Sequence, residues 1–367
     1  MNRDRCDIVI PVWNNLEITR DCVDSIIKNT LYPCRLVIID NASEKPTRDY
    51  LESLKKSGGI DARVITNKEN AGFVGAVNQG MRFSDAPYVC VMNNDTVVTA
   101  GWLGEMIDIM GAHEAIGLIN PSSNTSCQLP GKLDVDSYAL TLQNMKGGFQ
   151  ELYTCRAFAM VVKRAVIEKI GYLDDDYGMG YYDDTDYSKR AQAAGYLTVR
   201  AKASYVWHRE SQSFSKIKEK GRIFTENEKK FNARWGRLLR IGYVVPRAGT
   251  AGEEERIAAN INAIAKSGHQ VWVFSVKSVK ERLKLIDHES IRFYLYPSLF
   301  FRLVALYKIL KRRRKKRLDL ILTNDAPALN LFGVFGNAAG SGIIEDRDYG
   351  VIEKEIKRLS FGQEAVF

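Results

Sequence analysis

The sequence predicts an α/β protein whose N-terminal part is built on a doubly wound sheet. Short apolar runs rich in β-branched residues alternate there with segments whose apolar residues recur every three or four positions. Strands that alternate with helices in this way favour a right-handed, doubly wound parallel sheet. The first strands are expected at 7–12, 35–43, 62–67 and 88–95, and one of the intervening helices at 74–83.

Three of these strands end in polar residues, namely Asn14–Asn15, Asp40–Asn41 and Asn94–Asp95. One polar ending is an ordinary turn signal. Parallel strands, however, present their carboxyl ends at one edge of a sheet, where open α/β folds bind their ligands. Three such endings in one sheet therefore predict a binding site.

The alternating pattern continues beyond the first strands and then restarts. Residues 122–150 lack periodicity and are expected to form a long excursion. The order expected after it is a strand at 155–164, two helices around a Gly/Tyr-rich loop at 165–196, a strand in 197–210 and a helix in 211–240. From residue 240 a strand, a glycine-containing loop, an amphipathic helix and another strand follow. We therefore expect two domains, residues 1–238 and 239–367.

The composition is that of an ordinary globular protein, with 45% hydrophobic and 26% charged residues among 367. No stretch approaches the ~20 apolar residues of a membrane-spanning helix, and the N-terminal run MNRDRCD does not have the pattern of a signal peptide. The six cysteines show no C-x-x-C spacing. They indicate reduced packing residues of a cytoplasmic protein rather than a disulfide framework or a zinc site.

The net charge of +9 is concentrated in two basic stretches, 216–240 and 311–317. For each stretch alone, a solvated helix face is the simpler interpretation. Segment 300–317, however, combines an apolar face with seven consecutive basic residues, so we expect it to bind an anionic membrane surface. The alternative is an ordinary helix packed on the second sheet. No RNA-binding motif or Cys/His finger occurs, so no nucleic-acid partner is expected.

Segment 68–81 combines Gly72 with the amides Asn70 and Asn78 at the start of an expected helix. Glycine lets the backbone approach a ligand closely, and a helix N-terminus favours a phosphate. The segment is neither a P-loop nor a dinucleotide-binding G-x-G-x-x-G motif. A phosphate bound without either motif needs another counter-charge, which a divalent cation held by Asp95 would provide. The alternative for Asp95 is a turn or helix cap.

Three carboxylates, Asp183, Asp184 and Asp186, open a later helix. Each stabilises the positive helix end by ~0.3–1 kcal/mol, but Asp183 and Asp184 also repel each other. A crowded carboxylate pair raises the pKa of a general base, and the tyrosine-rich loop before it offers ring faces for a sugar. His208, which follows the apolar run SYVW, is either a polar strand end or a second ligand of Mn²⁺ or Mg²⁺ beside Asp95.

Together these motifs resemble a family 2 glycosyltransferase of the GT-A fold. The resemblance covers about residues 6–210 and is carried by the runs IVIPVWNNLEITRDCVDSI, VIIDNAS, NAGFVGAVNQG, MNNDTVV, YDDTDYSKRAQAAGY and VWH. It implies a GT-A type, doubly wound mixed sheet and an inverting transfer of a sugar from a nucleoside-diphosphate donor. The form N-x-G-F-x-x-x-x-N-x-G is typical of members that use dTDP-rhamnose, so a deoxysugar is the first expectation, with a UDP-sugar as the alternative.

The resemblance also implies which residues hold the donor. Pro11 and Asn14 would lie beside the nucleobase, and Asp40 would contact the base or the ribose. Asn94 and Asp95 stand where the family has its D-x-D-type element. Asp95 would therefore hold the cation, and Asn94 the ribose or the donor sugar.

Asp184 takes the place of the catalytic base in the family's Glu-Asp-x-Asp motif, with Asp183 as its acidic neighbour. Two departures stand out. Asn93 occupies the position of the first acid of a D-x-D element, and Asp183 replaces the glutamate. Weaker cation affinity is the expected consequence, which makes His208 more important as a ligand.

Residues 239–367 resemble, more distantly, the start of a family 4 glycosyltransferase of the GT-B fold. The resemblance is carried by Gly249 and Gly252 in a loop, then Glu255–Arg256 and Gly268–His269. In that family the first half-domain mainly faces the acceptor, and the chain stops at Phe367, before a donor-binding second half. We expect a fragment of a longer two-enzyme polypeptide or an acceptor-binding module, with a structural appendage as the alternative.

The sequence thus predicts a metal-dependent, inverting glycosyltransferase of bacterial surface polysaccharide synthesis, such as that of O-antigen or capsule. Its acceptor would be a glycan or a lipid-linked saccharide. The enzyme would be located in the cytoplasm, peripheral to the inner face of the cell membrane. A catalytically inactive nucleotide-sugar or glycan-binding module is the alternative, against which the intact Asp184 argues. A sugar nucleotidyltransferase is disfavoured because its glycine-rich basic signature is missing from IPVWNNLE.

Overall fold

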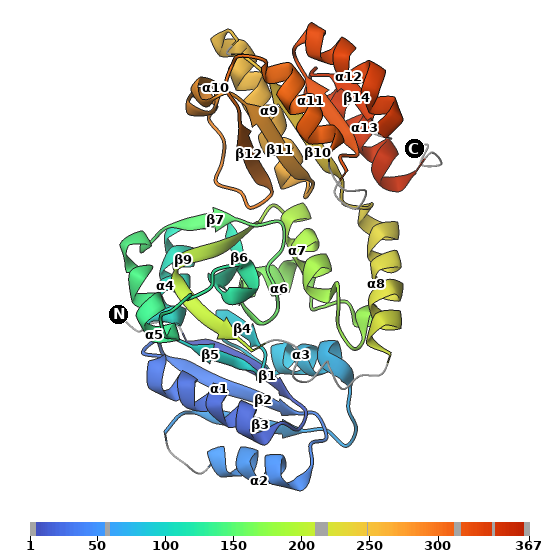
Figure 1. Cartoon of the computed structure of the whole chain (residues 1–367). Helices are drawn as coiled ribbons and strands as arrows, with labels where there is room; N and C mark the ends of the chain where they lie inside the picture. The colour runs from blue at the N-terminus through green and yellow to red at the C-terminus, as the bar shows by residue number, and fades with distance from the viewer. Residues whose placement is uncertain are drawn as a thin grey trace. The chain divides into compact units, whose positions relative to one another are not determined.

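A computed structural model describes residues 5–55, 59–209, 219–247, 249–311, 317–339 and 342–362 (Figure 1). The chain forms two compact units, residues 1–229 and 230–367. The domain boundary expected at residue 238 stays a prediction. The start of the helix expected in 211–240 and most of the basic run 311–317 lie outside the described residues.

The first unit is a mixed α/β fold around a central nine-stranded sheet with the order β3-β2-β1-β4-β8-β6-β9-β5, in which β7 also pairs with β9. Its strands are β1 (Cys6–Val12), β2 (Cys34–Asp40), β3 (Ala62–Thr66), β4 (Tyr88–Met92), β5 (Thr96–Val98), β6 (Ile116–Ser122), β7 (Phe149–Glu151), β8 (Ala159–Lys163) and β9 (Leu197–His208). The first four strands are parallel, whereas β8 runs antiparallel to both β4 and β6. The mixed sheet is therefore confirmed.

Helices cover both faces of this sheet (Figure 1). The helices of this unit are α1 (Leu16–Asn29), α2 (Lys45–Leu54), α3 (Gly72–Phe83), α4 (Trp102–Ala112), α5 (Val135–Thr141), α6 (Arg164–Ile170) and α7 (Asp183–Ala193), and the boundary between the units falls within α8 (Lys220–Trp235). The excursion expected at 122–150 contains α5, β7 and two short 3₁₀ turns, one of them at Asn124–Ser126.

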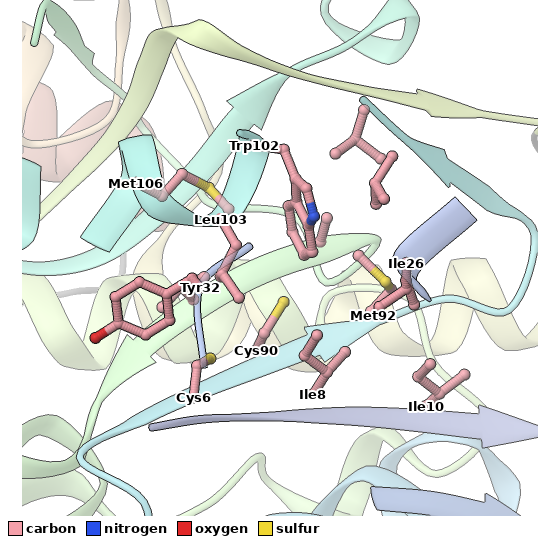
Figure 2. Close-up of a cluster of buried hydrophobic side chains, with 14 of the residues drawn as sticks. Cys6, Ile8, Ile10, Ile26, Tyr32, Cys90, Met92, Trp102, Leu103 and Met106 are labelled. Atoms are coloured by element: carbon pink, nitrogen blue, oxygen red, sulfur yellow. The ribbon is translucent and has the colours of Figure 1, made fainter. Parts of the chain in front are cut away.

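Side chains along the central strands alternate between two apolar cores. On β1, Ile8 and Ile10 join the core under α1, α2 and α4, whereas Val9 joins the core under α3, α6 and α7. Figure 2 shows the first of these cores, with Trp102 of α4 above the strand residues. Both faces of the strands are buried, which explains their nearly continuous apolar sequences.

One glycine of α3 fixes how closely this helix lies on the sheet. A Cβ atom at Gly80 would lie 2.3 Å from Cγ1 of Val9 on β1. A side chain there would push α3 away from the strands. The N-terminus of α3 is thereby held at the carboxyl edge of the sheet, close to the ends of β1 and β2.

The second unit contains a five-stranded sheet in which every pair is parallel, with the order β12-β11-β10-β13-β14. Its elements are β10 (Arg240–Val245), α9 (Ala251–Lys266), β11 (Gln270–Ser275), α10 (Lys277–Arg282), β12 (Ile291–Leu295), α11 (Phe301–Leu310), β13 (Leu320–Thr323), α12 (Ala326–Ala339), β14 (Gly342–Glu345) and α13 (Tyr349–Phe361). A capping box between Thr250 and Glu253 begins α9. The unit has its own apolar core.

Within the described ranges, no helix has the length and apolar character needed to cross a membrane.

Candidate functional site

Asp95 and His208 are brought together by the antiparallel pairing of β5 with β9. Thr96 pairs with His208, and the backbone N–H of Arg209 donates to the carbonyl of Asp95 at 2.9 Å. Nε2 of His208 lies 3.0 Å from Oδ1 of Asp95. That oxygen is buried and accepts no hydrogen bond from the described residues. The two atoms are thus close neighbours without being aligned as donor and acceptor.

Asn124 holds the backbone of His208, and Phe158 holds its ring. The side-chain oxygen of Asn124 accepts from its backbone N–H at 2.8 Å, and the amide group of Asn124 donates to its carbonyl at 2.8 Å. The ring stacks on Phe158, with centroids 5.3 Å apart and planes at 13°. These contacts fix Nε2 toward Asp95 and leave little rotational freedom to lose when a ligand binds.

The Asp95–His208 pair fits two positions in the coordination shell of a divalent cation. Ligand atoms at about 2.0–2.1 Å from one ion and at right angles are about 2.9 Å apart, close to the observed separation. An imidazole nitrogen and a carboxylate oxygen suit Mn²⁺. The described residues contain no cluster of three or more His, Cys, Asp or Glu that could hold a metal ion. Diphosphate oxygens and water would have to fill the remaining positions, as is usual for Mg²⁺ at phosphate sites.

Asp183 and Asp184 stand at the first turn of α7 in a crowded, largely dry place. Asp183 is 4% exposed, and its Oδ2 has no hydrogen-bond partner among the described residues. Burial, with the adjacent Asp184 carboxylate, raises the pKa of Asp183 well above its usual value. Burial also raises the pKa of Asp184, although hydrogen bonds from the Ala157 N–H at 3.2 Å and the Thr185 hydroxyl at 3.1 Å oppose this.

The loop that precedes the acid pair has an unusual backbone. Tyr181 and Tyr182 both have positive φ, 69° and 68°, which bulky side chains rarely adopt. The loop also lies against the start of α3: the N–H of Val74 donates to the Gly178 carbonyl at 3.1 Å, and a Cβ at Gly72 would lie 3.0 Å from that oxygen. The group that approaches Gly72 closely is therefore the backbone of this loop.

One pocket of about 340 Å³ joins the two pairs of residues. Its lining includes both Asp95 and His208 and both Asp183 and Asp184. The remaining lining residues are Phe73, Asn93, Thr125, Arg156, Ala157, Phe158, Gly180, Tyr181 and Tyr182. This volume lies in the range of small-molecule sites, which is about 300–1,000 Å³.

A second pocket adjoins the first and shares Phe73, Asn93 and Asp95 with it. It lies at the carboxyl ends of β1, β2 and β4, and its other lining residues are Pro11, Val12, Trp13, Asn41, Asn70, Asn94 and Met179. The aromatic and apolar members offer a surface for a flat ring, and the amides offer hydrogen bonds. The predicted residues Pro11, Asn70 and Asn94 thus lie together with Asp95.

Four predicted residues, Asp40, Asn14, Asn94 and Asn78, make hydrogen bonds within the protein; of these only Asn94 lines the second pocket. Asp40 is fully buried; its Oδ1 accepts from the Ser43 N–H at 2.9 Å, and its Oδ2 has no described partner. Asn14 accepts from the Glu44 N–H at 2.7 Å. The remaining two hold neighbouring elements in place: Asn94 donates to Thr19 at 2.9 Å, and Asn78 exchanges hydrogen bonds with the backbone of Leu173 at 2.9 and 3.0 Å. Their binding roles stay predictions.

Sequence reasoning missed Arg156, Asn124 and Phe158. Arg156 lies just before β8, and because β8 runs antiparallel to β4, the start of β8 reaches the same edge as the end of β4. An arginine directly before an apolar strand was the available signal, but strand direction cannot be read from such a run. Asn124 and Phe158 are recognisable only from their contacts with His208.

Residues 7–171 match the family model described as Glycosyl transferase family 2. The uncharacterized glycosyltransferase EpsJ of Bacillus subtilis (strain 168) is 19% identical over 62% of this chain and 67% of its own length. Poly-beta-1,6-N-acetyl-D-glucosamine synthase of Staphylococcus epidermidis is 22% identical over 46% of this chain and 42% of its own length. The chain spans from 24% to 67% of the length of such curated relatives.

A solved structure also resembles part of the chain. It is the mannosyltransferase PcManGT from Pyrobaculum calidifontis in complex with GDP-Man and Mn²⁺, which is 17% identical, with a TM-score of 0.47 over 58% of this chain and 59% of that one.

Proposed function

We propose that the first unit is an inverting glycosyltransferase that moves a sugar from a nucleoside-diphosphate donor to a hydroxyl of a glycan or lipid-linked saccharide. One observation carries the proposal: a single pocket is lined both by the Asp95–His208 pair and by the Asp183–Asp184 pair. The first pair suits the diphosphate end of a donor, and the second suits proton removal from an acceptor. The family match over residues 7–171 supports the same reaction class.

On the donor side, the second pocket would hold the nucleotide. Pro11 and Trp13, which line this pocket, would face the base. Contact of Asp40 with the base or the ribose stays a prediction, because Asp40 is fully buried and is not among the residues that line the pocket. Asp95 and His208 would hold Mn²⁺ or Mg²⁺, which neutralises charge on the leaving diphosphate. The side-chain nitrogen of Asn93, 3.3 Å from Nε2 of His208, would have to release that atom when the ion binds.

On the acceptor side, Asp184 would remove the hydroxyl proton. The raised pKa of Asp184 makes its carboxylate a stronger base than an ordinary aspartate. Attack by the acceptor oxygen forms the new glycosidic bond while the bond to the diphosphate breaks, so one displacement inverts the anomeric configuration. The proton passes to Asp184, and the diphosphate leaves with the bonding electrons. Tyr181 and Tyr182, both in this pocket, would contact the sugar rings.

The setting that we propose is the synthesis of a bacterial surface polysaccharide. Two of the relatives, EpsJ and the poly-N-acetylglucosamine synthase, are a glycosyltransferase and a polysaccharide synthase by name. The donor would be dTDP-rhamnose or a UDP-sugar, available in the cytoplasm.

The second unit, in this proposal, is a Rossmann-like acceptor-binding module similar to the first half of a GT-B enzyme. Its strand order β12-β11-β10-β13-β14 supports this, because doubly wound folds bind their ligands at the carboxyl edge where the strand order reverses, here between β10 and β13. The glycine-containing loop between β10 and α9 begins at that edge.

Transfer assays with a panel of nucleotide sugars, with and without Mn²⁺, test the function. Asp95→Ala and His208→Ala should each abolish the cation-dependent part of nucleotide binding, measured by calorimetry, because each removes one of two protein ligands. His113→Ala is the matched control, because His113 is exposed and lines neither pocket. Unchanged cation-dependent affinity in both site variants would exclude the pair as ligands, and nucleotide binding without turnover of any donor would favour a binding module.

A further inference from the structure

Helix α11 of the second unit is apolar on two opposite faces. One face is buried in the core of the unit and consists of Phe301, Ala305, Leu306 and Ile309. The opposite face is open, and we call it the α11 stripe. It consists of Leu303, Tyr307 and Leu310 of the helix together with Phe300 directly before it, which are 57%, 54%, 39% and 67% exposed.

Leu303, Tyr307 and Leu310 follow one another at steps of four and three residues, which places their side chains in one row along the helix, and Phe300 stands directly before the first helical residue. Packing in the core of the unit explains why the buried face of α11 is apolar, but it does not explain the exposed row. Single exposed apolar residues are common on protein surfaces, whereas a contiguous exposed row marks an interaction surface.

The sequence on either side of the stripe carries charges of one sign, although Arg302 of α11 is paired with Asp325 at 2.7 Å. The segment from Ser290 to Leu318 contains ten basic residues and no acidic residue. Lys308 and Lys311 are exposed on α11 itself or at its end. Nζ of Lys311 bonds to the Tyr307 hydroxyl at 2.9 Å and lies 5.3 Å from the centre of that ring. Leucine and aromatic side chains flanked by lysines are typical of helices that lie in the surface of a bilayer.

We propose that the α11 stripe, together with Lys308 and Lys311, binds the surface of a bilayer that contains anionic lipids. The apolar side chains would enter the boundary between headgroups and acyl chains, and the lysines would remain at the level of the phosphates. The uniform positive charge favours this partner over a second copy of the chain, because two such basic surfaces repel each other. The proposal does not depend on transferase activity.

Flotation of the whole chain with vesicles tests it. Binding is expected to vesicles of phosphatidylcholine mixed with phosphatidylglycerol, to fall with rising salt, and to be weak with phosphatidylcholine alone. Lys308→Gln combined with Lys311→Gln should weaken binding roughly tenfold or more, since cations near an anionic surface each contribute severalfold. Leu303→Ser combined with Tyr307→Ser should weaken it by a similar factor.

Matched controls use exposed residues elsewhere. Leu31→Ser with Leu140→Ser, at sites 91% and 70% exposed, and Lys45→Gln with Lys277→Gln should leave vesicle binding unchanged. Equal binding by the stripe variants and the wild type, or no salt-sensitive binding, would overturn the proposal. So would self-association without vesicles that Leu303→Ser with Tyr307→Ser abolishes, because the partner would then be a second copy.

Discussion

Replacing Asp184 with asparagine keeps the size of the side chain and removes its capacity to accept a proton. Turnover is expected to fall by about 10²–10⁴-fold, the usual cost of losing a general base, while donor and cation binding stay unchanged. Steady-state kinetics and calorimetry measure the two effects separately. Asp183→Asn is the comparison and should cost less, because the Asp184 carboxylate remains.

The stereochemistry gives an independent check on the same residue. The anomeric configuration of the product, read from NMR coupling constants, should be opposite to that of the donor. Retention of configuration, or near-normal turnover of the Asp184→Asn enzyme, would show that Asp184 is not the base.

Asp183 should lower the stability of the folded chain at neutral pH. Because its pKa is raised on folding, the native state keeps a proton that the unfolded chain releases, and the free energy of unfolding falls as pH rises from about 4 through the folded-state pKa. Asp183→Asn should therefore raise the melting temperature at pH 7, and this gain should shrink toward pH 4. A gain that is independent of pH would show that ionisation of Asp183 is not the cause.

At the level of elements, helix α8 holds the loop that carries the acid pair. The side-chain amide of Asn227, which is 3% exposed, donates to three carbonyls of that loop, those of Tyr177, Gly180 and Tyr181, at 3.1, 2.8 and 3.3 Å. The Tyr182 hydroxyl donates to Glu228 at 3.2 Å. Asn227 is thus a positioning residue for a loop whose backbone is otherwise unfavourable.

We expect Asn227→Asp to lower kcat by about 10–100-fold with little change in the KM for the donor, because small displacements of catalytic groups are costly. The new carboxylate would face the carbonyl oxygens and, by displacing the acid pair, should also move the pH profile of kcat. Asn232→Asp on the same helix is the control. A lower melting temperature with unchanged kcat and pH profile would reduce Asn227 to a purely structural role.

Much of the sheet could be predicted, because strands buried on both faces give continuous apolar runs. The expected strands at 7–12 and 62–67 agree with β1 and β3 to within one residue. Strand β6 was missed, because Gly117 and Pro121 interrupt its apolar run. A Cβ at Gly117 would lie 2.7 Å from the Tyr196 side chain, so this glycine reflects close packing between distant segments.

The candidate site was predictable where strand ends carry polar residues, as at Asp95 and His208. The site was not predictable where a residue contributes only through contacts with a loop that lies far away in the sequence. Asn227 looks like an ordinary surface residue of a charged helix, and its contacts with the loop at 177–181 are a result of tertiary structure alone.

At the scale of the whole molecule, the two units have separate cores. Matched substitutions of fully buried strand leucines, Leu36→Ala in the first unit and Leu320→Ala in the second, should each cost about 2–5 kcal/mol. Scanning calorimetry should show each variant shifting a different transition. Donor nucleotide at 100 times its Kd should stabilise only the transition that Leu36→Ala lowers, by about 2.7 kcal/mol. A single transition that responds to both variants would show that the units unfold together.

The pairing of β5 with β9 also has a consequence for the newly made chain. Asn93 and His208 are 115 positions apart, and the strand that carries His208 is the last of the first unit's sheet. Contacts between such distant positions form late, because the loop between them must be closed first. During synthesis, Asp95 and His208, the proposed cation ligands, cannot meet until residue 208 has left the ribosome. If the proposal holds, cation-dependent nucleotide binding marks the completion of this unit.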